Sequence, residues 1–250
     1  MAINIKNDEQ IALMRVAGEL TAQCHRAVAS VIRPGVTTME LEKEARAFME
    51  VNDADPSFLG YNGYPAALCV SVNEEIIHGT PSLKKLKNGD IVSVDIGVKK
   101  NGFHGDCART YFVGDVSPKA RNLVETTEAS FFEGVKFAEP GRRLYEISGA
   151  INDYVESAGY SVVREYVGHG VGRRLHEDPQ IPNYRMPSKG PRLAAGMVLA
   201  IEPMVNAGRC EIKLLDDGWT VVTADGSLSA HYENTILITE TGYEILTPVE

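Results

Sequence analysis

The sequence predicts an α+β fold, for three reasons. Helical periodicity occurs in the first 50 residues and again over residues 119–138, strand-like runs separate these segments, and further strand-like runs fill the C-terminal third. A composition of 44% hydrophobic and 24% charged residues is ordinary for a globular protein and argues against disorder, collagen and coiled coil. Because no linker-like or low-complexity tract interrupts them, residues 1–250 are expected to form one continuous domain.

Two helices are predicted in the first 50 residues. Apolar residues recur every three or four positions over residues 8–32, which is the spacing of one helix face. Asn7 with Gln10 has the form of a capping box at the start of this helix. A Pro-Gly pair then breaks it, and Thr37 with Glu40 forms a second capping box ahead of another apolar helical pattern.

The same pattern of helix-breaking and helix-starting residues recurs later in the chain. The helix-like segment 119–138 ends at Pro140 and Gly141, and Glu146 follows its proline at the same distance as Glu40 follows the earlier one. An internal duplication would explain this recurrence and would make the chain two α+β halves around one sheet. Chance is the alternative, and a match between strands would decide between the two.

Seven strand-like runs are bounded by turn residues: Ala67–Val72, Ile91–Val98, Thr110–Val113, Ser161–Val167, Met197–Ile201, Thr220–Thr223 and Thr235–Thr239. After the second run, the Asn101-Gly102 pair predicts a type I′ hairpin in which Gly97 faces Asp106. Because side chains alternate in period two, Asp95 shares a face with Gly97 and becomes a diagonal neighbour of Asp106. The hairpin therefore points two carboxylates at one spot.

Buried acids are the strongest chemical signal. Asp95 lies inside the apolar run IVSVDIGV, where an unpaired carboxylate would cost several kcal/mol. For a lone aspartate, a pair with Lys99 or Arg109, or a role in a turn, is the simpler interpretation. Glu202 and Glu233, however, also lie in apolar strand-like runs. Several such acids are difficult to satisfy separately, so a shared divalent metal site is favoured.

A dinuclear centre would suit these acids, because two divalent cations balance the charge of four carboxylates. His169, in YVGHGVG, is placed to complete one coordination shell, since it follows a strand-like run and lies between two glycines. Taken alone, His169 is better explained as a core histidine bonded to backbone. Oxygen-rich ligation with one nitrogen favours Mn, Fe, Co or Zn over Ca.

Other functional classes are disfavoured. The net charge of −9 argues against a general phosphate-binding surface, so no sequence-specific nucleic acid partner is expected. The spacing of the four cysteines is typical of reduced thiols in a cytoplasmic protein. Neither a signal peptide nor a run of about 18 apolar residues is found, so no membrane association is expected. Walker A, complete dinucleotide-fingerprint, HExxH and GxSxG motifs are absent from the sequence.

The order of these acids and the histidine resembles that of bacterial type I methionine aminopeptidases, in the pita-bread family that also includes prolidase and aminopeptidase P. The similarity covers essentially the whole chain, through GYNGYPAALCVSVNEEIIHG, DIVSVDIGV, HGDCARTY, GHGVGRRLHEDPQIPNY, LAIEPM and DGWTVVTADGSLSAHYENTILIT. It implies a pita-bread fold, with two pseudo-symmetric α+β halves sharing a central, mostly antiparallel sheet and helices outside. It also implies removal of the initiator methionine from nascent proteins with a small second residue, by attack of metal-activated water.

The resemblance implies a role for each ligand. Asp95 would chelate one divalent metal (Co, Mn, Fe, Zn or Ni), and Asp106 and Glu233 would bridge two. His169 and Glu202 would hold the other metal. Glu202 would also shuttle the proton of the attacking water.

The resemblance also implies residues that contact substrate. His78 and His176 would contact the scissile amide and stabilise the tetrahedral intermediate, whereas alone they would be explained as a turn residue and a loop residue. The expected methionine pocket is Tyr61, Tyr64, Cys69 and Trp219. Phe58 and Leu175 depart from the cysteine and phenylalanine familiar in enterobacterial enzymes, which would alter affinity rather than chemistry. Asn73 and Ser229 match a monovalent Na or K site.

Three alternatives remain open. Prolidase or aminopeptidase P relatives usually carry a sizeable domain ahead of the catalytic one, whereas the first helix here is predicted by residue 8. Type II methionine aminopeptidases carry a helical insertion for which the C-terminal half has no room. A non-catalytic relative would lose metal ligands, and all five are present. The expected partners are nascent polypeptide N-termini, with transient ribosome contact, and the protein is expected to be a cytoplasmic monomer.

Overall fold

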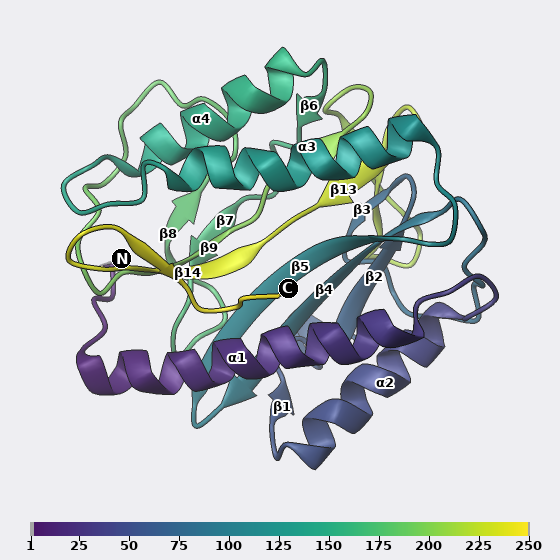
Figure 1. The fold of residues 1–250 in the computed structure, drawn as a ribbon, viewed down its shortest axis with the longest axis horizontal. Helices are drawn as coiled ribbons and strands as arrows, with labels where there is room; N and C mark the ends of the chain where they lie inside the picture. The colour runs from purple at the N-terminus through teal and green to yellow at the C-terminus, as the bar shows by residue number, and fades with distance from the viewer. Residues whose placement is uncertain (1–2, 250) are drawn as a thin grey trace.

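Two pairs of helices enclose the strands of residues 3–249, the part of the chain that the computed structural model describes (Figure 1). The first pair is α1 (Asp8–Val31) and α2 (Thr38–Val51), and the second is α3 (Pro118–Val135) and α4 (Leu144–Ser157). The strands lie between the two pairs, as Figure 1 shows. No helix within residues 3–249 has the length and apolar character needed to cross a membrane.

Both predicted capping boxes are confirmed. The Asn7 side chain accepts a hydrogen bond from the Gln10 backbone at 2.9 Å, and the Gln10 side chain accepts one from the Asn7 backbone at 3.1 Å. Thr37 and Glu40 make the same reciprocal pair at the start of α2. These bonds satisfy backbone donors that the first turn of a helix otherwise leaves unpaired, so the two helices begin where the sequence predicts.

Fifteen strands are described within residues 3–249, and all their pairings are antiparallel. They are β1 (Asp55–Pro56), β2 (Leu68–Val72), β3 (Glu75–Ile77), β4 (Ile91–Lys100), β5 (Phe103–Phe112), β6 (Ser161–Val162), β7 (Gly168–Gly170), β8 (Glu177–Ile181), β9 (Val198–Ile201), β10 (Met204–Asn206), β11 (Ile212–Leu214), β12 (Val221–Thr223), β13 (Ser229–His231), β14 (Asn234–Ile238) and β15 (Tyr243–Ile245).

The strands form four hydrogen-bonded sheets rather than the single continuous one expected. One contains β1, β4, β2 and β5, and another has the order β15-β14-β9-β7-β8. The smaller sheets are β13-β10-β6 and β11-β12-β3. Individual bonds, instead of a ladder, join β5 to β14 and to Glu233 just before it. Glu233 N donates to Ala108 O at 2.9 Å, and Thr235 Oγ1 donates to Asp106 O at 2.8 Å.

The predicted runs differ from the observed strands by one or two residues at an end, except for two runs that differ by more. The run Thr110–Val113 is only the end of β5, which begins directly after the Asn101-Gly102 turn. The run Ser161–Val167 is strand only over Ser161–Val162. Its partner β10 begins at Met204, because the preceding Pro203 has no N–H to donate and interrupts the ladder.

The second helix pair repeats the backbone pattern of the first, which supplies the strand-level match that the sequence left open. Gly35 N donates to Leu86 O at 2.7 Å, and Gly141 N donates to Leu193 O at 2.9 Å. Isolated antiparallel bridges also follow at equivalent places, just before α2 and just before α4. The prediction of two α+β halves is therefore confirmed.

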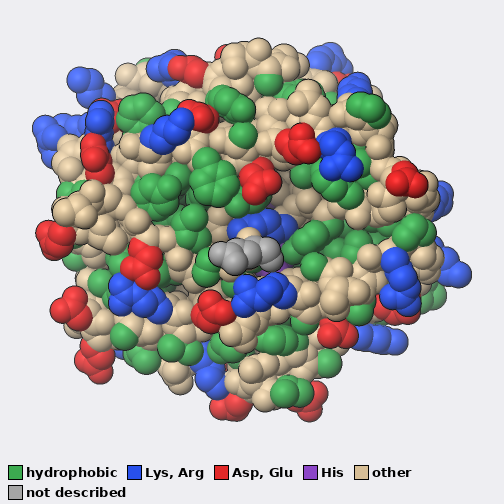
Figure 2. All heavy atoms as spheres, viewed as in Figure 1, with side chains coloured by type: hydrophobic (Ala, Val, Ile, Leu, Met, Phe, Trp, Pro, Cys, Tyr) green, Lys and Arg blue, Asp and Glu red, His purple; other side chains and the backbone are tan. Residues whose placement is uncertain are grey.

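Each helix pair covers its own apolar cluster. α1 and α2 pack on β2 and β4 through residues such as Val28, Leu41 and Ile96, all fully buried. α3 and α4 cover a second cluster that includes Phe131 and Ile147. On the face that Figure 2 shows, acidic and basic side chains are interspersed.

Candidate metal centre and its pocket

The β4–β5 hairpin has the predicted register. Gly97 faces Asp106, and both Asn101 and Gly102 have positive φ, as a type I′ turn requires. Asp95 and Asp106 consequently line one cavity from the same side of the hairpin. Gly97 leaves space on this face, because a Cβ there would lie 2.7 Å from the ring of Phe58, which forms a wall of the cavity.

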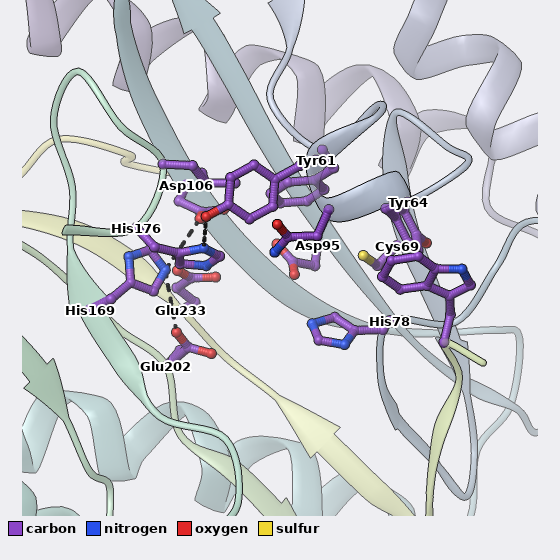
Figure 3. Close-up of a pocket in the computed structure, with 14 residues that line it drawn as sticks. Tyr61, Tyr64, Cys69, His78, Asp95, Asp106, His169, His176, Glu202 and Glu233 are labelled. Carbon is purple, nitrogen blue, oxygen red and sulfur yellow. Dashed lines mark hydrogen bonds and ion pairs between the residues drawn. The ribbon is translucent and has the colours of Figure 1, made fainter. Parts of the chain in front are cut away.

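The other half supplies the remaining ligands. Glu202 directly follows β9, and Glu233 lies between β13 and β14, where its N–H is bonded to the β5 backbone. His169 lies on β7, opposite Ala200 of β9. All three side chains line the same cavity as the two aspartates, and Figure 3 shows the five groups converging.

The imidazole of His169 is oriented by its own backbone. Its Nδ1 lies 2.9 Å from the carbonyl of Gly170, and because a carbonyl only accepts, Nδ1 carries the proton. Nε2 is therefore the free lone pair, 3.7 Å from both Asp106 Oδ2 and Glu202 Oε1. A neutral imidazole with one nitrogen held by backbone and the other facing carboxylates has the form of a metal ligand.

Electrostatics within this cluster are unfavourable without a cation. Burial raises the pKa of Asp95 to about 7, and burial together with Asp95 raises the pKa of Asp106 and of Glu202 well above their usual values. Burial and Asp106 raise the pKa of Glu233 in the same direction. Burial also lowers the pKa of His169 to about 3, so no protonated imidazole compensates the acids near neutral pH.

The donor set fits divalent metal. Among the described residues, Asp95 Oδ1, Asp106 Oδ1 and Glu233 Oε1 are buried oxygens with no hydrogen-bond partner. Ligand atoms of Asp106, His169 and Glu233 lie within 4.8 Å of one another. A bound cation would satisfy these oxygens and keep the carboxylates ionised, and carboxylates with one imidazole are a usual set for Mn, Fe, Co or Zn.

The simpler interpretation of Asp95, a pair with Lys99 or Arg109, is wrong. Arg109 is buried, and its guanidinium donates to the backbone carbonyls of Ala108 and Glu233 and to the side-chain oxygen of Asn234. No ion pair within residues 3–249 joins Lys99 or Arg109 to the clustered carboxylates. Arg109 instead supports the backbone that carries Glu233.

The two further histidines lie on the cavity wall. His176 Nδ1 is 2.7 Å from the hydroxyl of Tyr61, and its ring centroid is 4.1 Å from that of His169. His78 has a positive φ of 57° in the turn after β3 and packs edge-on against Tyr166. Burial lowers the pKa of His176, and burial with His176 lowers the pKa of His78 to about 4, so both rings are neutral near pH 7.

An apolar pocket adjoins the carboxylates. Tyr64, Cys69, Phe58 and Leu175 form a separate buried cluster with Ala66, against which Tyr61 and Trp219 pack. Tyr64 and Trp219 meet edge to face with centroids 5.2 Å apart. The structure thus brings together all four predicted pocket residues and both residues at which the sequence departs from the enterobacterial pattern. Figure 3 labels Tyr61, Tyr64 and Cys69 among them.

Asn73 and Ser229 meet through their backbones, because Ser229 N donates to Asn73 O at 2.8 Å. Their side chains are bonded elsewhere: Asn73 Oδ1 accepts from Ile91 N at 3.1 Å, and Ser229 Oγ donates to Asn206 Oδ1 at 2.9 Å. Neither residue lines the cavity of the carboxylates. The structure therefore places this pair near each other but apart from the metal cluster.

Sequence reasoning missed His231. It is 2% exposed, and its Nε2 has no hydrogen-bond partner among the described residues and lies 3.9 Å from Glu202 Oε2. In SAHYEN, His231 precedes Glu233 by two residues, but His231 ends β13 and Glu233 lies before β14, so alternation along one strand does not predict that they share a face.

Comparison with known proteins identifies the family. The sequence pattern of metallopeptidase family M24 matches residues 12–240. The chain is 54% identical over 248 residues to the methionine aminopeptidase of Clostridium perfringens, covering 99% of this chain and 100% of that protein. It is 56% identical over 244 residues to methionine aminopeptidase 1 of Bacillus subtilis, covering 98% of both.

Solved structures agree. The crystal structure of methionine aminopeptidase from Rickettsia prowazekii matches with a TM-score of 0.97 at 42% identity, covering 99% of this chain and 100% of that one. The prolidase from Pyrococcus furiosus matches with a TM-score of 0.81 at 27% identity, and the match covers 98% of this chain but 66% of that one. The chain therefore belongs to metallopeptidase family M24 and, within it, groups with the methionine aminopeptidases.

Proposed function

We propose that this protein removes N-terminal methionine from polypeptides at the cavity formed by the two halves. The observation that carries the proposal is the set of partnerless buried oxygens on Asp95, Asp106 and Glu233 beside an apolar pocket. Asp95, Asp106, His169, Glu202 and Glu233 would hold the divalent metal, since all five side chains line this cavity. When bound, the ions supply a water of lowered pKa and polarise the scissile carbonyl.

The side chains of the cavity divide the remaining work. Glu202 accepts the proton of the attacking water and passes it to the leaving amine. If the Tyr61 hydroxyl donates to His176 Nδ1, the proton of this neutral ring is on Nε2 and can be donated to the oxygen that gains charge. His78, also neutral, contacts the same amide from the turn after β3.

The pocket selects the first side chain. Tyr64 and Trp219 present ring edges and faces with which a thioether makes favourable contacts, and Phe58, Cys69 and Leu175 exclude water from it. Phe58 and Leu175 are expected to shift substrate affinity and leave the chemistry unchanged. Asn73 and Ser229 remain a prediction of a monovalent cation site.

The biological setting proposed is the cytoplasm, where a monomer acts on nascent chains with a small second residue during transient ribosome contact. The four cysteines are free, with three of them buried, as is usual in a reducing compartment. Figure 2 offers no basic patch on the face that it shows, so the ribosome contact rests on the kind of substrate alone.

Release of methionine from peptides tests the proposal. A Met-Gly-Met peptide should be cleaved and a Met-Leu-Met peptide should not, with activity lost on chelation and recovered with Mn, Fe or Co. Full activity in protein shown to be metal-free by elemental analysis would refute the mechanism. Faster cleavage of X-Pro peptides than of Met-Ala peptides would instead favour a prolidase-like activity.

A further inference from the structure

A buried ion pair outside the cavity connects the N-terminal segment to the loop that carries His176. Lys6 Nζ lies 2.9 Å from Glu177 Oε2, and the two side chains are 5% and 3% exposed. Asn4 Nδ2 donates to the same carboxylate oxygen at 3.0 Å. These two bonds join the N-terminal segment to the first residue of β8, Glu177.

The Glu177 carboxylate also organises the loop between β7 and β8. Its Oε1 accepts a hydrogen bond from Arg174 N at 3.3 Å, and a Cβ on Gly172 would lie only 2.5 Å from the same oxygen. The loop is thus folded around this carboxylate, and Gly172 provides the space. The Lys6 ammonium is the ion-pair partner of that carboxylate within the described residues.

Glu177 directly follows His176, so its placement fixes the position at which the His176 backbone enters β8. The hydrogen bonds from Lys6 and Asn4 outweigh the effect of burial and lower the pKa of Glu177, which keeps the carboxylate ionised. The N-terminal segment is itself anchored, because Lys6 N donates to Gly196 O at 2.8 Å at the entry to β9. Lys6 therefore connects a fixed strand entry to the loop.

We propose that Lys6 is a positioning residue, which holds His176 at its working distance from the substrate through the Glu177 carboxylate. This inference rests on the proposed role of His176. An ion pair that only stabilised the fold could lie anywhere in the molecule. This one neutralises the carboxylate that organises the loop carrying His176. Displacement of a catalytic group by about 1 Å can lower a rate about 100-fold.

Three variants test the proposal. Lys6→Met leaves Glu177 without its cation, Lys6→Arg keeps the charge, and the double variant Lys6→Met with Glu177→Gln removes both charges and so avoids a buried unpaired carboxylate. Arg15→Met is the matched control, because the Arg15–Glu244 pair, at 2.7 Å, also joins the N-terminal region to a distant strand but is half exposed and remote from the cavity.

For Lys6→Met and for the double variant, kcat for Met-Gly-Met should fall about 10- to 100-fold, while KM and the Mn affinity measured by calorimetry stay within about twofold. Lys6→Arg should restore most of kcat, and Arg15→Met should leave it unchanged. In the metal-free protein with ¹⁵N-labelled histidine, the ring signal lost in His176→Gln should shift or broaden in Lys6→Met.

A folded Lys6→Met or double variant with wild-type kcat and an unchanged His176 signal would overturn the proposal. So would parallel loss of kcat, substrate affinity and Mn affinity, since that outcome indicates general destabilisation. His176→Gln separates this inference from the function itself. If His176→Gln loses turnover and neither variant of Lys6 does, only the positioning role fails; if His176→Gln is fully active, the role proposed for His176 fails.

Discussion

The two halves of the molecule place their acids differently although their backbones repeat. Asp95 and Glu202 each lie six residues after a glycine of positive φ, Gly89 and Gly196. Each of these glycines donates its N–H, at 2.9 Å, to the end of the neighbouring strand, at Val113 O or Ile238 O. Asp95 nevertheless lies within a continuous strand of ten residues, whereas Glu202 lies just past the end of a strand of four.

The difference shows how one backbone plan can serve two tasks. In the N-terminal half both Asp95 and Asp106 lie within the unbroken β4–β5 ladder. In the C-terminal half Glu202 and Glu233 lie where strands are interrupted, and their support comes from side chains such as Arg109. The two aspartates on the regular hairpin thus lie opposite two glutamates, which have a longer side chain and a less regular backbone. This difference suits Glu202 to move a proton as well as to bind metal.

The largest expected effect separates the two equivalent acids. Glu202→Gln should lower kcat for methionine release about 10²- to 10⁴-fold at saturating Mn, because a proton acceptor is lost. Asp95→Asn should weaken Mn binding and recover more of its kcat as Mn is raised. If the two variants recovered the same fraction of kcat across a Mn titration, Asp95 and Glu202 would not differ in role.

Arg109 tests whether the interrupted half depends on side-chain support. In Arg109→Met the Glu233 carbonyl and the Asn234 side chain lose their donor, so Mn affinity measured by calorimetry should fall about 10- to 100-fold. Arg121→Met is the control, since Arg121 lies 4.5 Å over the ring of Phe112, away from the acids. The same affinity in both variants would show that Arg109 is dispensable.

The helix cores should differ in their response to pH. His25 lies on α1, where its Nε2 is 2.8 Å from Cys107 O and its Nδ1 is 3.1 Å from the Tyr111 hydroxyl. Phe131 is the equivalent residue on α3, and it packs on Tyr232. Burial, with Arg109 adding to it, lowers the pKa of His25 to about 3. Between pH 6.5 and 3 the unfolded chain therefore binds a proton that the folded chain does not, and stability falls as pH falls.

Because of His25, the unfolding free energy of the wild type should be about 2 kcal/mol lower at pH 5 than at pH 7. The variant His25→Phe carries the residue found at the equivalent position of α3, and this side chain does not titrate. The difference in unfolding free energy between variant and wild type should therefore be about 2 kcal/mol smaller at pH 5 than at pH 7. Urea unfolding with chelator present at both pH values measures it. A difference independent of pH would place the titration elsewhere.

The smallest effect compares the two equivalent helix starts. Thr37 caps α2 with its side chain, whereas Arg143 at the start of α4 makes no side-chain cap bond. Thr37→Ala should cost about 1 kcal/mol of unfolding free energy, and Arg143→Ala less than about 0.5 kcal/mol. Equal costs in urea unfolding would remove the capping distinction.

Sequence prediction succeeded where local rules decide the structure. The Asn101-Gly102 turn fixed the register that places Asp95 beside Asp106, and the capping boxes fixed the starts of α1 and α2. The C-terminal half could not be predicted in the same way. Its short strands are defined by partners far along the chain, and His231 lies near Glu202 because β13 pairs with β10, which begins two residues after Glu202.

The resemblance to known enzymes, rather than the pattern of residues, supplied the roles of His78 and His176. Nothing local to either residue predicts that they share a cavity, since His78 follows β3 and His176 precedes β8. The Lys6–Glu177 pair was likewise invisible in sequence, because its partners are 171 residues apart. Long-range contacts of this kind require the fold.

The two halves of the molecule are expected to bind a pair of divalent ions together. Crystals grown with Mn, with diffraction recorded on both sides of the Mn absorption edge, test this directly. We expect two anomalous peaks, with Asp106 and Glu233 contacting both, Asp95 contacting one, and His169 and Glu202 the other. A map with no peak among these five side chains at saturating Mn would contradict the account.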